Sequence, residues 1–286
     1  MSEKPRLATE SIAGLRPYQE DSVLTQTLPD GRTLVAVADG MGGHAAGEVA
    51  SALALEVLEE AVAAGTPLGE AFALANRTVH AKAREPGKAG MGTTLVAMLL
   101  DGDSYELANV GDSRAYLISG EGIRQVTEDH SFVAEAIKRG QSEEEALNSK
   151  WKDALTKSIG TDAEVTADVY GPFPVEPNMA VMLCSDGCYK TLRSDDLLDI
   201  YVKSGGPRGA AQSLVSEAYD RGSDDNITVA IAEFGEVPRE RPAGTMPLEF
   251  EAPEPEAPES EPESPAGPEA GEEPGEGKSW WKKMFD

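Results

Sequence analysis

The first part of the chain alternates between a continuous apolar run and segments with helical spacing. Residues 33–38 (TLVAVA) are apolar and end at Asp39, which predicts a buried strand that runs into a turn. Between residues 47 and 64, apolar side chains recur on one stripe, which predicts an amphipathic helix. Residues 64–67 (AGTP) interrupt this spacing, and a second helix is predicted over residues 68–83.

The spacing of apolar residues along the chain changes after these helices. From residue 93 to residue 127, short apolar segments alternate with Gly and Asp turns, which predicts an antiparallel meander. Residues 131–170 are polar and mixed, and we expect a flexible, flap-like insert with two short helical pieces. Further on, the pattern predicts strands over residues 180–184 and 226–234, a helix that follows Ser194 as its N-cap, and another helix over residues 207–221. Helices and antiparallel strands thus occur in separate blocks, which favours an α+β fold with sheets covered by helices.

The composition excludes several classes of protein. The 286 residues include 25 basic and 51 acidic ones, giving a net charge of −26. Nucleic acids and anionic membranes are bound by clustered Lys and Arg, so we expect no nucleic acid as a partner and, apart from one short terminal segment, no anionic membrane. No apolar run is long enough to span a bilayer, and the N-terminus has no apolar core typical of a secretory signal. Two cysteines are too few for a disulfide framework, so a cytoplasmic location is predicted.

The C-terminal part differs in composition from the rest. From residue 235 onward there are 14 acidic and 5 basic residues, together with ten of the 19 prolines. We therefore predict a catalytic domain over residues 1–234, large enough to bury a substantial core, and a disordered Pro/Glu-rich linker over residues 235–277.

The last nine residues, 278–286 (KSWWKKMFD), combine aromatic and basic side chains. Trp280, Trp281 and Phe285 are interleaved with lysines, which favours a docking motif at the end of the linker. The motif could enter a groove on a partner protein, rest weakly at a membrane interface or fold back onto the catalytic domain. A terminus that has no partner is the alternative.

Acidic residues cluster at the ends of the predicted strands. We expect four to follow apolar strands directly, and one to begin a similar apolar stretch: Asp39, Asp112, Asp186 and Asp225 in the first group, and Asp21 in the second. Each one alone is ordinary turn chemistry, and the sequence does not show that they meet in space. If strand ends converge at one edge, however, these carboxylates repel each other unless cations neutralise them. Ligand sets made only of oxygen favour hard ions such as Mg²⁺ or Mn²⁺.

Seven short motifs in one order carry a resemblance to a known family. They are RPYQED (16–21), DGMGGHAAGEVAS (39–51), GTT (92–94), GDSRAY (111–116), TEDHS (127–131), CSDG (184–187) and DDNITV (224–229). Together they resemble the metal-dependent type 2C serine/threonine protein phosphatases, in particular the bacterial branch. The resemblance covers about residues 6–234. It implies two antiparallel sheets packed as a sandwich, with helix pairs on both outer faces.

The resemblance also implies a site with two Mn²⁺ or Mg²⁺ ions and a third, weaker ion. The implied ligands of the two core ions are Asp39, the carbonyl of Gly40, Asp186 and Asp225, while Glu20 and Asp21 would hold metal-bound waters. Asp112 would join Asp186 at the third ion. Arg16 would hold the substrate phosphate, which suits a planar guanidinium fork.

The implied reaction is direct attack of a metal-bridging hydroxide on the phosphate. The serine or threonine alkoxide is a poor leaving group, so a proton must reach it. His44 is the candidate acid; a metal-bound water is the alternative donor, and His44 would then only orient the following helix. Two departures from the family pattern, at Lys152-Asp153 and Thr156-Lys157, concern the insert and put the substrate preference in doubt.

These observations predict a cytoplasmic, monomeric protein serine/threonine phosphatase. Its partners would be phosphorylated proteins and an opposing Ser/Thr kinase. Two alternatives remain: a non-catalytic module of the same fold that binds phosphoproteins, and a phosphatase that acts on small phosphoesters.

Overall fold

The computed structural model describes residues 4–42 and 45–238. Contacts divide the chain into one unit, Met1–Phe250, and a second unit, Glu251–Asp286. The candidate acid His44 and the docking residues Trp280, Trp281 and Phe285 lie outside the described residues. Among the residues that the structure describes, no helix combines the length and apolar character needed to cross a membrane.

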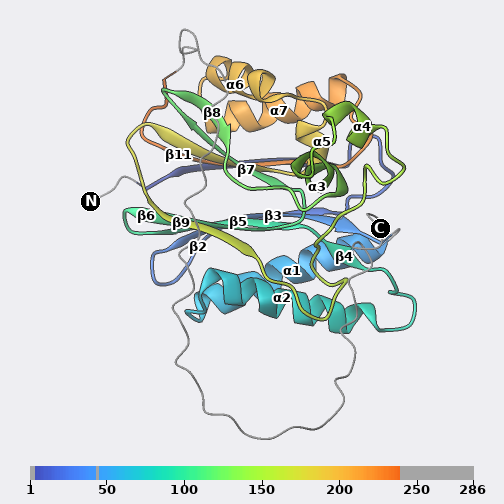
Figure 1. Ribbon diagram of the computed structural model, residues 1–286. Helices are drawn as coiled ribbons and strands as arrows, with labels where there is room; N and C mark the ends of the chain where they lie inside the picture. The colour runs from blue at the N-terminus through green and yellow to red at the C-terminus, as the bar shows by residue number, and fades with distance from the viewer. Residues whose placement is uncertain (1–3, 43–44, 239–286) are drawn as a thin grey trace, which may run out of the picture. The chain divides into compact units, whose positions relative to one another are not determined.

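Two antiparallel sheets form the centre of the first unit (Figure 1). The first sheet has the order β1 (Arg6–Ile12), β11 (Ile227–Phe234), β10 (Met179–Cys184), β7 (Arg114–Ser119) and β8 (Gly122–Gln125). The second has the order β2 (Asp21–Thr27), β3 (Thr33–Met41), β5 (Leu95–Asp101), β6 (Ser104–Val110) and β9 (Asp168–Pro174), and β4 (Gly92–Thr93) pairs with β3. The described strand pairs are all antiparallel.

Helix pairs cover the outer faces of the two sheets (Figure 1). The second sheet carries α1 (Ala45–Ala63) and α2 (Leu68–Ala83), and the first sheet carries α6 (Ser194–Lys203) and α7 (Pro207–Asp220). Three shorter helices are α3 (Phe132–Lys138), α4 (Glu143–Leu147) and α5 (Asp186–Tyr189). The predicted sandwich of two sheets between helix pairs is confirmed.

The apolar run in β3 has a simple origin in this layered arrangement. Val35 and Val37 face the other sheet and belong to the core between the sheets. Leu34, Ala36 and Ala38 point the opposite way and pack in the core beneath α1 and α2. Side chains alternate between the two faces of a strand, so a strand with both faces buried is apolar at every position.

The structure corrects several predicted boundaries. Strands β1 and β9 were not predicted, and the expected insert over residues 131–170 overlaps β9, which begins at Asp168 and pairs with β6. Helix α6 begins at Ser194 itself, and the Asp196 carboxylate accepts a hydrogen bond from the Arg193 backbone N–H at 3.1 Å. Both missed strands lie at sheet edges, where half-exposed residues show no clean alternation.

Candidate active site

Antiparallel pairing brings the predicted acidic residues to one end of the sandwich. In such a pair, the end of one strand lies beside the start of its neighbour. Asp21 at the start of β2 is therefore directly opposite Asp39 near the end of β3. In the other sheet, β10 ends beside the start of β11, so that Asp186 follows one strand and Asp225 precedes the other. The expectation that strand ends converge is met for these four residues.

The Asp21 carboxylate connects the two sheets. Its Oδ2 accepts hydrogen bonds from Ser185 Oγ at 2.8 Å and from Thr228 Oγ1 at 2.6 Å. Thr228 lies in β11 of the first sheet, and Ser185 directly follows β10 of that sheet. Asp21, by contrast, begins β2 of the second sheet. A buried carboxylate held by two donors is thus a fixed point of the site.

Glycine allows α5 to approach the start of β11 closely. A Cβ atom on Gly187 would lie 2.1 Å from the backbone oxygen of Asn226. Since Gly187 follows Asp186 and Asn226 follows Asp225, this approach determines how near the two carboxylates can be. The glycine is therefore required by space at this position, and no unusual backbone angle is involved.

A Gly187→Ala substitution is expected to lower both activity and stability. The added methyl group collides with a backbone oxygen, so α5 must move away from β11 and separate Asp186 from Asp225. We expect a cost of about 1–3 kcal/mol in unfolding free energy, typical of overpacking, together with weaker Mn²⁺ binding. Thermal melts and calorimetric Mn²⁺ titration would measure both. Gly120→Ala is the matched control, because its Cβ would meet only an ordinary contact at 3.6 Å. Unchanged melting and metal binding in Gly187→Ala would contradict this account.

Asn226 holds the loop that carries Arg16. Its Nδ2 donates to the backbone oxygens of Ala13 and Tyr18, each at 2.9 Å, and its Oδ1 accepts from Glu20 N–H at 2.7 Å. Arg16 in turn donates from Nε to the Asp224 backbone oxygen at 2.7 Å and from Nη2 to Asp225 Oδ2 at 2.8 Å. The guanidinium is exposed on the rim of the carboxylate cluster, where it can meet an anion from solvent.

Burial and mutual repulsion raise the pKa values of the clustered carboxyl groups. Burial raises the pKa of Asp21 to about 7, against the hydrogen bonds from Thr228 and Ser185. Burial and the charge of Asp186 raise the pKa of Asp112 to about 7 as well. Loss of hydration, followed by the charges of Asp21 and Asp186, raises the pKa of Asp39 well above its usual range. Burial also raises the pKa of Asp225. The charge of Asp186 acts on each of these four groups, so the five carboxylates lie close enough to interact electrostatically.

The cluster fits divalent cations by its chemistry, although several of its oxygens are hydrogen bonded within the protein. Within residues 4–42 and 45–238, no three His, Cys, Asp or Glu side chains already form a group able to hold a metal ion. One oxygen each of Asp21, Asp186 and Asp225 is hydrogen bonded to a protein donor. Yet Oδ1 of Asp21 and Oδ1 of Asp186 are buried without a hydrogen-bond partner. Orphaned carboxylate oxygens in a repulsive cluster are what hard cations satisfy. The all-oxygen donor set therefore fits Mg²⁺ or Mn²⁺.

Asp112 enters the cluster from the turn between β6 and β7, and an arginine–tyrosine stack braces that turn. The Arg114 guanidinium lies 3.5 Å from the centroid of the Tyr189 ring, at the end of α5. It also donates to both oxygens of Asp129, with the shortest contact at 2.7 Å from Nη2. The stack fixes α5, and with it Asp186, against the strand that follows Asp112.

His130 anchors the insert to the same turn. Gly111 N–H donates to His130 Nδ1 at 3.1 Å, so the ring proton resides on Nε2, which lies 3.1 Å from Asp168 Oδ2. Lys157 Nζ donates to Asp168 Oδ1 at 2.8 Å. The hydrogen bond from His130, followed by that from Lys157, lowers the pKa of Asp168. His130 thereby joins Gly111, the base of the insert and β9.

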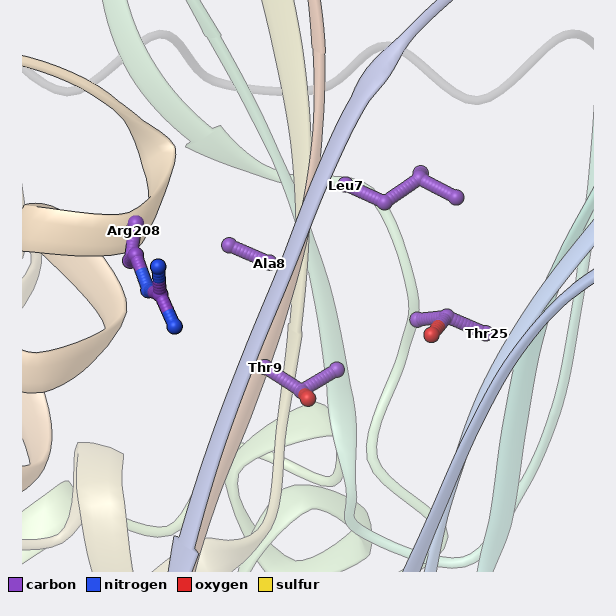
Figure 2. A pocket seen from close by; sticks show the side chains of 5 residues that line it. All are labelled: Leu7, Ala8, Thr9, Thr25 and Arg208. Carbon is purple, nitrogen blue, oxygen red and sulfur yellow. The ribbon is translucent and has the colours of Figure 1, made fainter.

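A cavity elsewhere lacks comparable chemistry. About 300 Å³ in size, it lies along the edge strands β1 and β2 (Figure 2). Figure 2 shows Leu7, Thr9 and Thr25 on one side of β1, and Ala8 and Arg208 on the other. The cavity is lined by apolar side chains, two threonine hydroxyl groups and a single charged residue, Arg208. Because ligand sites usually contain several polar groups that point at one place, the carboxylate cluster is the better candidate site.

The structure thus brings together most of the residues that the sequence singled out. Gly40 joins the cluster through its N–H, which donates to the Glu20 backbone oxygen at 3.1 Å. Sequence reasoning missed Asn226, Ser185, Thr228 and Lys190. The first three lie inside the motifs CSDG and DDNITV, but only the fold shows which loop or carboxylate they contact.

Comparison with known proteins identifies the family. A family model described as protein phosphatase 2C matches residues 16–217. Serine/threonine phosphatase stp of Listeria welshimeri is 35% identical over 231 residues, which make up 77% of this chain and 91% of that protein. The crystal structure of serine/threonine phosphatase Stp1 from Staphylococcus aureus has a TM-score of 0.74 and 29% identity, covering 82% of this chain and 96% of that one. The catalytic domain of the phosphatase PstP, solved with two manganese ions, has a TM-score of 0.70 and 30% identity, covering 82% and 99%.

The two-sheet fold, its acidic end and these matches agree on one class, the metal-dependent phosphatases. The chain belongs to the protein phosphatase 2C family and is a protein serine/threonine phosphatase. The resemblance found in the sequence is therefore confirmed, and so is the predicted enzyme class.

Proposed function

We propose that this phosphatase hydrolyses phosphoserine and phosphothreonine in phosphoproteins with two divalent cations, Mn²⁺ or Mg²⁺, held at the carboxylate cluster. The ligands would be Asp39, the carbonyl of Gly40, Asp186 and Asp225, with Glu20 and Asp21 as hydrogen-bond acceptors for water behind them. Bound divalent cations would activate water as the nucleophile and neutralise phosphoryl oxygens. The observation that carries the proposal is the convergence of five mutually repelling carboxyl groups, two with buried oxygens that lack partners.

The chain's own residues have distinct roles in this proposal. Arg16 lies exposed beside Asp225, where its guanidinium can bind two phosphate oxygens at once. Ser185 and Thr228 keep Asp21 in one orientation through its Oδ2, which leaves the buried Oδ1 without a protein donor. His44 remains the candidate for protonating the leaving alkoxide and lies outside the described residues. The family resemblance implies a third, weaker ion at Asp112.

The cellular setting is part of the same proposal. A phosphatase of phosphorylated serine and threonine needs a kinase that supplies its substrate, so an opposing Ser/Thr kinase is the proposed functional partner. Cys184 and Cys188 are buried, free thiols, which suits the reducing cytoplasm.

Phosphate release from a phosphothreonine peptide tests the proposed function. We expect release with Mn²⁺, none with EDTA, and a loss on the order of a thousandfold in Asp186→Ala, because metal-held charge stabilisation contributes several kcal/mol. Circular dichroism would verify that the variant is folded. If a folded, Mn²⁺-loaded protein released no phosphate, the non-catalytic binding module would be favoured instead. Hydrolysis of p-nitrophenyl phosphate but not of the peptide would favour a small-phosphoester enzyme.

A further inference from the structure

Lys190 lies against the proposed metal ligands. Its Nζ is 2.5 Å from Asp186 Oδ2, and its backbone N–H donates to the Asp186 backbone oxygen at 2.9 Å, one turn of α5 away. The same Nζ lies 3.9 Å from Oδ1 of Asp153, which belongs to the insert. About half of the lysine side chain is exposed, so the ammonium reaches the cluster from solvent while its stem covers α5.

The positive charge of Lys190 acts on more than its hydrogen-bonded partner. This charge opposes part of the rise in the pKa of Asp112 and of Asp225, which burial keeps above the usual value. Arg16 places its guanidinium on Asp225, whereas Lys190 places its ammonium on Asp186. The cluster therefore has a protein cation on each of these two carboxylates, and of the two it is Lys190 whose charge acts on Asp112.

We propose that Lys190 is a built-in counter-ion that replaces a third divalent cation between Asp186 and Asp112, so that this phosphatase binds two divalent ions and not three. The inference rests on the proposed metal site. An ammonium in hydrogen-bond contact with Asp186 repels a divalent cation at the same oxygen and shares the space that the cation would need. Asp186 Oδ2 is then committed to Lys190, and the buried, partnerless Oδ1 is the oxygen left to ligate a core ion.

This arrangement has a chemical consequence. A lysine tethered on α5 places its positive charge beside Asp186 at any concentration of free metal, whereas a weakly bound ion occupies its site only when the free metal concentration reaches or exceeds its dissociation constant. Charge neutralisation at Asp186 then depends on the folding of α5, which carries Lys190, and on the insert, which contacts Lys190 through Asp153. It depends less on the concentration of free metal.

The number of bound ions tests the proposal directly. Lys190→Met keeps the apolar stem and removes the charge. We expect two Mn²⁺ per chain in the wild type and three in Lys190→Met by equilibrium dialysis with elemental analysis, the third ion gaining at least about tenfold in affinity. Adding Asp112→Asn to Lys190→Met should return the count to two, whereas Lys190→Arg should stay at two. Lys203→Met is the matched control, because Lys203 makes the same i,i+4 contact with Asp199, at 3.7 Å, on the distant helix α6.

Each outcome decides the matter. A wild type that binds a third Mn²⁺ as tightly as Lys190→Met overturns the proposal, as does a Lys190→Met variant that stays at two. In either case two core ions and phosphate release would still uphold the proposed function. A folded wild type that binds no Mn²⁺ and releases no phosphate would instead overturn the proposed function itself.

Discussion

Replacing Asp39 by Asn is expected to reduce Mn²⁺-dependent phosphate release about a thousandfold and to leave the fold intact. The loss follows because the carboxylate is the proposed ligand at the centre of the cluster, and metal-held charge stabilisation contributes several kcal/mol to the rate. The fold should survive because the backbone at this position is held by other groups. Asp39 N–H donates to Thr94 Oγ1 at 2.9 Å, and Thr94 N–H donates to the Asp39 oxygen at 2.8 Å. Steady-state kinetics on a phosphothreonine peptide would measure the effect.

The same variant has a second expected result that a merely damaged protein would not show. Asp39 is repelled by four other carboxylates, so Asn should raise the melting temperature of EDTA-treated protein at pH 8 while it weakens Mn²⁺ binding. Asp101→Asn is the control. Asp101 is exposed at the C-terminal end of β5, whereas Thr94, which contacts Asp39, directly precedes the start of this strand. Near-normal turnover in Asp39→Asn, or a lower melting temperature in EDTA, would contradict the assigned role.

Chelator-treated protein is expected to lose stability as the pH rises from about 4 to about 8. The pKa values of Asp21 and Asp112 rise from 3.8 to about 7 in the fold, so the folded state binds these protons more tightly than the unfolded chain. Their contribution to stability is fully present below the unfolded pKa and is lost as the pH rises through the folded value. For Asp21 alone the shift corresponds to about 4 kcal/mol of unfolding free energy, on the order of 10 °C in melting temperature. Asp168, whose pKa is lowered, acts only at the acidic end of this range.

Thermal melts across this pH range, with EDTA and with Mn²⁺, would measure the dependence. General repulsion in a chain of net charge −26 also grows with pH, so the double variant Asp21→Asn/Asp112→Asn is needed to isolate the cluster. Its melting temperature in EDTA should fall less steeply than that of the wild type. Added Mn²⁺ should remove the fall, because metal ligands bind in the deprotonated form. Equal slopes for wild type and double variant would contradict the cluster as the source.

Local patterns were sufficient for elements with a strong period or two buried faces. The spacing of apolar residues predicted helix α2 over residues 68–83, and the structure has it at Leu68–Ala83. The run at residues 33–38 predicted the strand β3, because residues 34–38 of this strand are all apolar and are buried on both faces of the sheet. Strand β1 (RLATESI) was missed because its partner is β11: Arg6 pairs with Glu233, far along the chain, at a half-exposed sheet edge.

For the acidic site, too, local sequence predicted some features and only the fold showed the others. By itself, the sequence determined the carboxylates at strand ends and the ordered motifs of the family, since turn chemistry and residue type are local properties. Only the tertiary structure showed that Ser185 and Thr228 hold Asp21 across the two sheets, that Asn226 anchors the Arg16 loop and that Lys190 lies on Asp186. Contacts between distant segments depend on strand pairing and on the close approach of backbones, and neither is encoded in the spacing of residues along one segment.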